Sequence, residues 1–212
     1  MVRLPTRLDR SFFDRGTLLV CRELLGKSLV RLDDRGRRVS GLVIEAEAYI
    51  GMEDLGCHAH AGRTARNASM WGPPGHAYVY FTYGMHWMLN FVTEREGFPA
   101  AVLIRGVAPV EGLRAMRRRR KGRPLADLAN GPAKLCQAFR IDRHFDGHDL
   151  CQGTSRVFVE DRPPVPDEAI RSGPRVGLDP VPEPWRSMPW RYRIHPEHVR
   201  YLVIQEERDE IA

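Results

Sequence analysis

The segment from Leu42 to Tyr49 alternates apolar and polar residues with the period of two that is typical of a β-strand. Leu42, Ile44, Ala46 and Ala48 should share one face, and Glu45, Glu47 and Tyr49 the other. Two carboxylates on one face lie only about 7 Å apart, so repulsion and any burial should raise the pKa of at least one. A raised carboxyl pKa suits a general base. A half-exposed sheet with a polar outer face produces the same pattern, and both interpretations stay open here.

Hydrophobic periodicity also predicts two β-hairpins and several single strands. Residues 27–32 and 37–49 should pair about a polar turn, and residues 77–82 and 87–93 should pair about Tyr83-Gly84. Further apolar strands are expected at 101–107, 155–160, 175–178 and 190–194. Residues 51–76 lack periodicity and are rich in Gly and Pro, which predicts a long loop of the kind that is usually functional.

Three helices are predicted. The first should run from Ser11, with Ser11 and Asp14 as a capping box, to a stop at Gly26. The second should span 109–116 and end in the basic run 117–121, and the third should enter through Gly131-Pro132 and continue over 133–139. Strands in hairpins with helices between them favour an α+β fold with a curved, mostly antiparallel sheet, flanking helices and a protruding hairpin.

Length and composition narrow the picture. A chain of 212 residues without a long linker is expected to form a single domain over 1–212, with residues 196–212 either a short helix or a disordered tail. The chain has no apolar run suited to a signal peptide or membrane span, which predicts a cytoplasmic protein without membrane contact. Four widely spaced cysteines suggest reduced thiols. The net charge of +6 and pI ≈ 9.4 favour a polyanionic partner.

The loop and the basic segments offer candidate ligands of two kinds. Asp54, Cys57, His58 and His60 are metal-ligand types, but their spacing does not fit a zinc site, so we expect no metal and a neutral hydrogen-bonded histidine instead. Arg63 and Arg66 on the loop, Lys134 at a helix start and the run 117–121 could all hold phosphates. A charge run can equally be a solvated helix end. The sequence contains no phosphate-loop or dinucleotide fingerprint, and no cofactor is expected.

Aromatic residues crowd the second hairpin. Alternation places Tyr78 and Tyr80 on one face, Phe81 is expected in the core, and Tyr83 should project from the tight turn beside Gly84. A large side chain at such a turn is difficult to explain by packing. It could act as a wedge between stacked bases.

A set of motifs, in one order along residues 10–194, resembles the alkyladenine (3-methyladenine) DNA glycosylase family in its bacterial form. The matching segments are Glu47–Tyr49, 51–58, 62–67, Tyr78–Tyr80, Tyr83-Gly84, Asn90, Val102–Arg105, Gly131–Leu135, Arg175–Gly177 and Pro189–Tyr192. The resemblance implies a base excision repair enzyme that flips an alkylated or deaminated purine out of duplex DNA and hydrolyses its N-glycosidic bond. It also implies damaged double-stranded DNA as the partner; we further expect a monomer associated with the nucleoid.

The same resemblance implies roles for individual residues. Glu47 matches the general base that activates water, and Arg105 helps to hold that water. Tyr49, His58 and Tyr80 match the residues that sandwich the flipped purine, Asn90 the residue that disfavours guanine, and Tyr83 the side chain that fills the gap in the duplex. No role is implied for Glu45. A glycosylase that also cleaves the strand needs an amine that forms a Schiff base with the sugar. The only plausible candidate is Lys134, and it lies at a helix start where we expect it to contact phosphate. We therefore predict a monofunctional enzyme.

Two other functions remain as alternatives. Basic sheets with exposed aromatics also bind RNA or DNA without chemistry. In such a binding module, Glu47→Gln would leave function intact. A nucleosidase that acts on free nucleosides is disfavoured by the basic composition and by Tyr83, which would have no stacked bases to separate.

Overall fold

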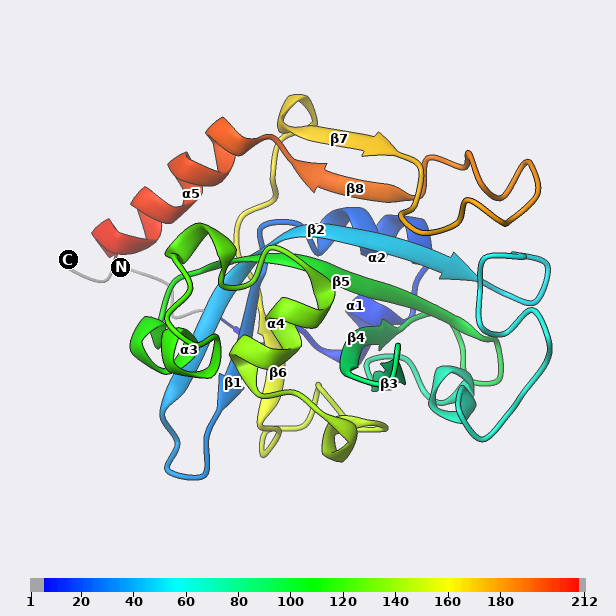
Figure 1. Cartoon of the computed structure of the whole chain (residues 1–212), viewed down its shortest axis with the longest axis horizontal. Helices are drawn as coiled ribbons and strands as arrows, with labels where there is room; N and C mark the ends of the chain where they lie inside the picture. Colours follow the sequence, from blue (N-terminus) through cyan, green and yellow to red (C-terminus); the bar gives the residue numbers. More distant parts are fainter. Residues whose placement is uncertain (1–5, 210–212) are drawn as a thin grey trace.

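The computed structural model describes residues 6–209, in which eight strands form one antiparallel sheet (Figure 1). The strand order is β3-β4-β5-β2-β1-β6, and β8 pairs with both β2 and β7. The strands are β1 (Ser28–Leu32), β2 (Arg38–Ile50), β3 (Ala77–Thr82), β4 (His86–Val92), β5 (Ala100–Pro109), β6 (Val157–Glu160), β7 (Ile170–Gly173) and β8 (Arg191–Ile194). This architecture confirms the predicted α+β class with a curved antiparallel sheet.

The helices flank the sheet. They are α1 (Arg10–Phe13), α2 (Thr17–Glu23), α3 (Leu113–Arg119), α4 (Pro132–Phe139) and α5 (Pro196–Asp209). Short 3-10 turns lie at Ala68–Trp71, Leu125–Asp127, Arg143–Phe145 and Asp167–Ala169. Most of the segment 196–212 is therefore helical, and residues 210–212 lie outside the described range. None of the helices within residues 6–209 has the length and apolar character needed to span a membrane.

The helix predicted from Ser11 to Gly26 is wrong, because the chain forms two short helices there. Asp9, not Ser11, caps α1, and its carboxylate accepts the Phe12 N–H at 3.2 Å. Gly16 then separates α1 from α2. Aspartate is one of the strongest N-cap residues, so the helix begins earlier than the capping-box pattern indicated.

Two further boundaries differ from the prediction. Residues 175–178 are not a strand, since Gly177 has φ +79° and the Val176 N–H bonds a side chain of β2; the strand lies earlier, at β7. The helix expected at 109–116 begins only at Leu113, because β5 continues to Pro109 and Gly112, with φ +72°, occupies the N-cap. Glycine is the residue that tolerates such a positive φ.

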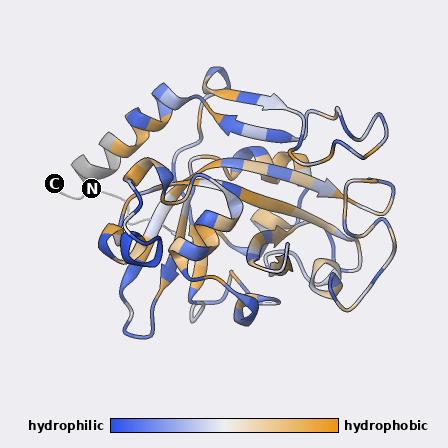
Figure 2. Cartoon of the chain, viewed as in Figure 1, coloured by the Kyte–Doolittle hydropathy of each residue, from blue (hydrophilic) through white to orange (hydrophobic). Residues whose placement is uncertain are grey.

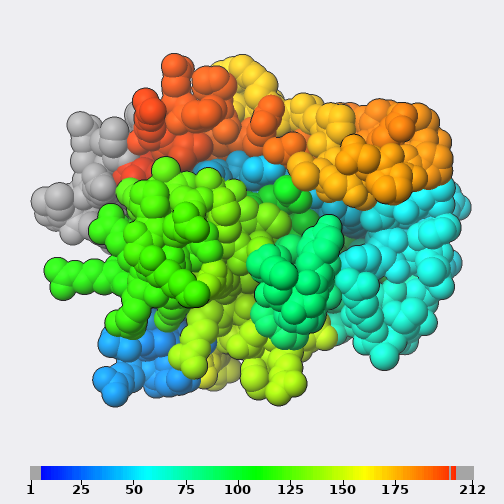
Figure 3. Space-filling model, viewed as in Figure 1, coloured from blue at the N-terminus to red at the C-terminus, as the bar shows by residue number. Residues whose placement is uncertain are grey.

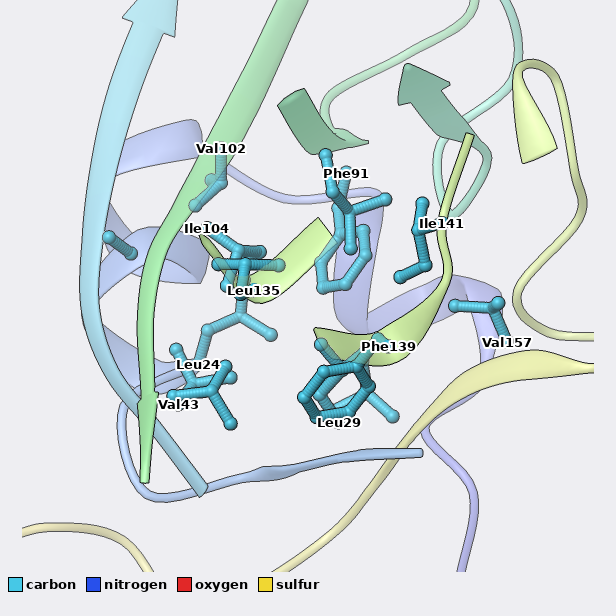
Figure 4. Packing of buried hydrophobic residues seen from close by; sticks show 14 of the residues in the cluster. Leu24, Leu29, Val43, Phe91, Val102, Ile104, Leu135, Phe139, Ile141 and Val157 are labelled. Atoms are coloured by element: carbon cyan, nitrogen blue, oxygen red, sulfur yellow. The ribbon is translucent and has the colours of Figure 1, made fainter. Parts of the chain in front are cut away.

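The buried core combines α2 and α4 with the central strands. Leu24, which caps α2, lies near Val43 of β2, and Leu135 and Phe139 of α4 lie among side chains of β1 and β5 (Figure 4). Hydrophobic residues follow β5 through the middle of the molecule, whereas hydrophilic residues predominate in the outer loops (Figure 2). This packing fixes the relative positions of β2, β5 and α4, which contribute residues to the candidate functional site.

Strand β2 lies in the middle of the sheet. It pairs with β5 along Gly41–Ile50, while its other edge pairs first with β1 and then, at Glu45–Glu47, with β8. The register shifts where Glu45 opposes Gly106. Leu42 and Val43 are both buried, and Glu47, which was predicted on a polar face, is fully buried. Strict alternation therefore fails in this strand because it is covered on both sides.

Candidate functional site

A pocket of ≈ 320 Å³ lies beside the β3–β4 hairpin and brings together residues that are distant in sequence. The lining includes six of the residues singled out from the sequence: Tyr49, His58, Tyr80, Tyr83, Asn90 and Arg105. They come from β2, the loop after β2, the hairpin and β5. The pocket is therefore built where the sheet, the long loop and the start of α4 at Pro132 meet.

Glu47 is fully buried and bonds to the pocket wall. Its Oε2 accepts the Tyr49 hydroxyl at 2.9 Å and Arg105 Nη1 at 3.2 Å, and its Oε1 accepts the Val176 N–H at 2.7 Å. Three donors from β2, β5 and the loop after β7 thus hold one carboxylate in a single orientation. Groups held this rigidly are suited to catalysis.

Burial raises the pKa of Glu47 above that of an ordinary glutamate, and this effect exceeds the opposing one of its donors. Arg105, the Val176 amide and the Tyr49 hydroxyl all favour the charged form and so limit the rise. The raised pKa agrees with the expectation from sequence, but repulsion from Glu45 is not among the causes. A carboxylate so placed can take a proton from water.

Arg105 lies between the two glutamates and donates to both. Its Nε donates to Glu45 Oε1 at 3.1 Å while its Nη1 reaches Glu47. Glu45 Oε1 also accepts Arg191 Nε from β8 at 2.6 Å. Arg105 thereby separates the carboxylates that the strand pattern placed side by side, and Glu45 acquires a structural connection to Glu47 that the sequence did not reveal.

Part of the pocket wall is aromatic. The ring centroids of His58 and Tyr80 lie 4.5 Å apart in an edge-to-face arrangement, and His58 Nδ1 lies 2.9 Å from the hydroxyl of buried Tyr78. Burial lowers the pKa of His58, which keeps its ring neutral near pH 7 and fits the predicted hydrogen-bonding role. Tyr78 had no assigned role, although alternation with Tyr80 already placed it on the same face.

Asn90 of β4 lines the same pocket and is buried. Its Nδ2 donates to the Tyr78 carbonyl at 3.0 Å across the β3–β4 pair. This bond fixes the amide plane, so the Asn90 side chain presents a defined polar group to whatever occupies the pocket.

Tyr83 projects from the hairpin turn, as predicted. Its side chain is 82 % exposed, and its φ of 51° reflects the tight turn that Gly84 shares. Met85 is also exposed. Phe81, expected in the core, is 43 % exposed, and its ring lies 4.7 Å from that of Trp87 at a tilt of 47°. The Phe81 prediction is wrong because the hairpin extends beyond the core. In Figure 3 the turn between β3 and β4, drawn blue-green, lies on the viewed face of the molecule.

Three of the basic residues predicted to contact phosphates, Arg63, Arg66 and Lys134, lie in different surroundings. Arg66 lies over the Tyr80 ring at 5.4 Å and donates to the Phe81 carbonyl at 3.3 Å, which places it at the pocket rim. Arg63 is exposed on the neighbouring loop. Lys134 instead pairs with Asp127 at 2.5 Å and with Asn130 at 2.9 Å, and it is not part of the pocket lining within residues 6–209.

The four metal-ligand types in the loop have separate partners. Asp54 pairs with Arg175, and the Cys57 thiol contacts the Met70 sulfur. His58 bonds Tyr78, and His60 Nδ1 lies 3.4 Å from the Met52 carbonyl oxygen. Within residues 6–209, His, Cys, Asp and Glu side chains do not gather into a group of three that could hold a metal ion.

Sequence reasoning missed the pair that anchors the loop after β7. The side chains of Arg175 and Asp54 are both 0 % exposed, and the guanidinium donates to the carboxylate through Nη1 at 2.5 Å and Nη2 at 2.7 Å. Arg175 also donates to the Ala48 carbonyl of β2 at 3.0 Å. It precedes Val176, so this pair places the N–H that holds Glu47. The signal in the sequence was the motif Arg175–Gly177, which carried no assigned role.

Comparison with known proteins shows the family to which the chain belongs. A protein of Methanocella arvoryzae assigned as a 3-methyladenine DNA glycosylase is 50 % identical over 186 residues, 87 % of this chain and 90 % of its own length. Two further proteins with the same assignment are also similar. The one from Desulfitobacterium hafniense is 42 % identical over 94 % of this chain and 99 % of its own length. The one from Streptomyces avermitilis is 45 % identical over 88 % of this chain and 90 % of its own length. The sequence model for methylpurine-DNA glycosylase (MPG) matches residues 11–198, which includes every residue of the pocket, and the chain belongs to that family.

Proposed function

We propose that this member of the methylpurine-DNA glycosylase family is a monofunctional enzyme that flips damaged purines out of duplex DNA and hydrolyses their N-glycosidic bond. Family membership makes the chain a DNA glycosylase that acts on alkylated bases. The finer proposal covers 3-methyladenine, hypoxanthine and ethenoadenine as lesions. The observation that carries it is Glu47, a buried carboxylate held by three donors beside an aromatic pocket.

The proposed reaction begins with water bound between Glu47 and the sugar. Ionised Glu47 accepts a proton as the water oxygen bonds to C1′ of the deoxyribose, and the bond from C1′ to the purine breaks with its electron pair leaving on the base. Arg105, already hydrogen-bonded to Glu47, helps to orient the water. Positive charge develops on the sugar as the base departs, and the nearby carboxylate stabilises it.

The pocket favours damaged purines through stacking and charge. Tyr49, His58 and Tyr80 can enclose a flat purine, and an aromatic slot attracts a cationic alkylpurine by about 0.5–2 kcal/mol more than a neutral one. A positively charged base is also the better leaving group. Asn90 would disfavour guanine through contact with its exocyclic amine.

Tyr83 would support base flipping. Extrusion of a nucleotide costs a few kcal/mol, least at a damaged pair. A side chain as exposed as Tyr83, at the end of a hairpin beside the pocket, can enter the duplex and take the place of the flipped base in the stack.

The positions of the lysines support a monofunctional reaction. Lys134 is ion-paired with Asp127, Lys27 pairs with Asp161 at 2.6 Å, and neither belongs to the described pocket lining, nor does exposed Lys121. A Schiff base with the abasic sugar needs a free amine at the reacting carbon.

Duplex oligonucleotides that each contain hypoxanthine, ethenoadenine or a methylated purine would test the proposal. We expect strand breaks only after alkali treatment, no borohydride-trapped adduct on abasic DNA, and no hydrolysis of the free nucleosides. A trapped adduct would contradict the monofunctional reaction. Tight, salt-sensitive binding without release of any base would instead support a binding module.

A further inference from the structure

We call the pocket of ≈ 320 Å³ beside the β3–β4 hairpin the lesion pocket. A second hollow, larger than the lesion pocket, lies between the β1–β2 turn, the end of α3 and the end of α4. Its volume is ≈ 570 Å³, and its lining consists of Asp33, Asp34, Arg35, Arg37, Arg118, Arg119 and Arg140. We call this the arginine hollow. The proposed function uses none of these residues.

The carboxylates of the arginine hollow are already engaged. Asp33 accepts Arg37 Nε at 2.7 Å and the backbone N–H groups of Arg35 and Arg37, and Asp34 pairs with Arg156. Within residues 6–209, Arg118 and Arg140 form no close ion pair with a carboxylate, although the charge of Arg140 still acts on Asp142, and both arginines line the hollow. The hollow therefore keeps an excess of positive charge.

A further, buried guanidinium, that of Arg31, lies within electrostatic reach of residues that line the hollow. Arg31 is only 7 % exposed, stacks over the Phe145 ring at 4.7 Å, and its Nε and Nη1 have no hydrogen-bond partner in the described structure. Burial, reinforced by the charges of Arg156, Arg119 and Arg140, lowers the pKa of Arg31 to about 10. Cations that repel one another in this way are stabilised by an anion.

Helix α4 connects the arginine hollow with the lesion pocket. Its first residue, Pro132, lines the lesion pocket, and Arg140, which caps its other end, lines the hollow. Eight residues of α-helix span about 12 Å, the length of roughly three to four base-pair steps of B-DNA. In Figure 1, α4 lies between the β3–β4 hairpin and α3.

We propose that the arginine hollow binds backbone phosphates of the same duplex, a few base pairs away from the flipped nucleotide. The inference rests on the proposed function, because the lesion pocket sets where the duplex lies. Arginine forks suit phosphate oxygens, and the contacts carry no sequence information. These contacts keep the enzyme bound to undamaged flanking DNA while Tyr83 of the hairpin enters the base stack.

The test compares wild type with the double variant Arg118→Gln/Arg140→Gln and with Arg171→Gln as a matched control. Arg171 is an exposed arginine of β7 whose guanidinium donates to nearby carbonyls. Duplexes with a central lesion carry either full flanks or about three base pairs on one side, short enough to end before the hollow. Affinity is measured as a function of salt, and base release by wild type is measured in parallel.

For the duplex with full flanks we expect the double variant to reduce the slope of log K against log salt by about two, because each arginine that no longer binds a phosphate removes about one from the slope. Truncation of one flank should weaken wild type and the control but not the double variant. Equal slopes and affinities for wild type and double variant would overturn the inference. If wild type releases the base in that case, the proposed function stands without the hollow.

The same hollow could hold free phosphate instead of DNA. Thermal unfolding in inorganic phosphate and in chloride at equal ionic strength separates the two sources. The inference would also be overturned by two results together. Phosphate, but not chloride, would raise the Tm of wild type and not that of the double variant, and the affinity of wild type for DNA would not depend on flank length.

Discussion

The ion pair between Asp54 and Arg175 offers a quantitative test of how the site is held. Both side chains are 0 % exposed, and the carboxylate also accepts the Ile50 N–H at 3.2 Å and the Gly56 N–H at 2.9 Å. Arg175→Met leaves the Asp54 carboxylate buried with these two amides only. Loss of one partner from a buried pair costs about 3–5 kcal/mol.

That cost translates into a large change in melting temperature. For a chain of this size, about 1 kcal/mol lowers Tm by about 2–4 °C, so Arg175→Met should lower Tm by about 6–20 °C. Arg186→Met is the matched control, because Arg186 pairs with Glu183 at 2.8 Å with both side chains about half exposed. Exposed pairs contribute only about 0–1 kcal/mol.

A double variant separates the cost of the unpaired charge from the loss of packing. Asp54→Leu combined with Arg175→Met removes both charges, and an apolar replacement of a buried pair is often neutral. Calorimetry or urea unfolding should therefore show the double variant to be more stable than Arg175→Met alone. If Arg175→Met unfolds within the range of Arg186→Met, the buried pair does not anchor the loop.

Two further predictions concern the reaction. Glu45→Gln removes the negative charge that Arg105 and Arg191 share with Glu47, so the two guanidinium groups should act more fully on Glu47. Both lower the pKa of Glu47, so the acidic limb of the pH profile of kcat/KM should move to lower pH. An unmoved limb would disprove this link. Tyr83→Ala removes the proposed wedge, and stacking of about 1–3 kcal/mol predicts excision from duplex DNA about five- to 150-fold slower, with excision from single strands unchanged. Equal slowing on both substrates would indicate that Tyr83 acts elsewhere.

Local pattern predicted the strands and the hairpins well. The alternation over 77–82 and the turn at Tyr83-Gly84 coincide with β3 and its turn, because strand period and turn residues are properties of short segments. The start of the first helix was predicted wrongly, and β7 was not predicted. The helix begins earlier because Asp9, and not Ser11, is its N-cap. Strand β7 has exposed Arg171 and Ser172 and lacks the apolar alternation that indicates a strand.

The site could be predicted only as a set of residues, not as an arrangement. Resemblance placed Glu47, Arg105 and the aromatic residues in one pocket, and the structure brings them together. Arg105 between two glutamates, and Arg175 121 residues away from Asp54, depend on contacts across the sheet that no local pattern contains. The origin of the raised pKa of Glu47 in burial also requires the fold.

The central claim is that Glu47 activates the water that releases the base. Single-turnover excision from a lesion-containing duplex, measured beside DNA affinity for wild type and Glu47→Gln, tests it most directly. The account predicts that Glu47→Gln abolishes base release while its affinity for the duplex stays equal or increases, because a negative charge near DNA is removed. Wild-type rates of base release in Glu47→Gln would contradict the account.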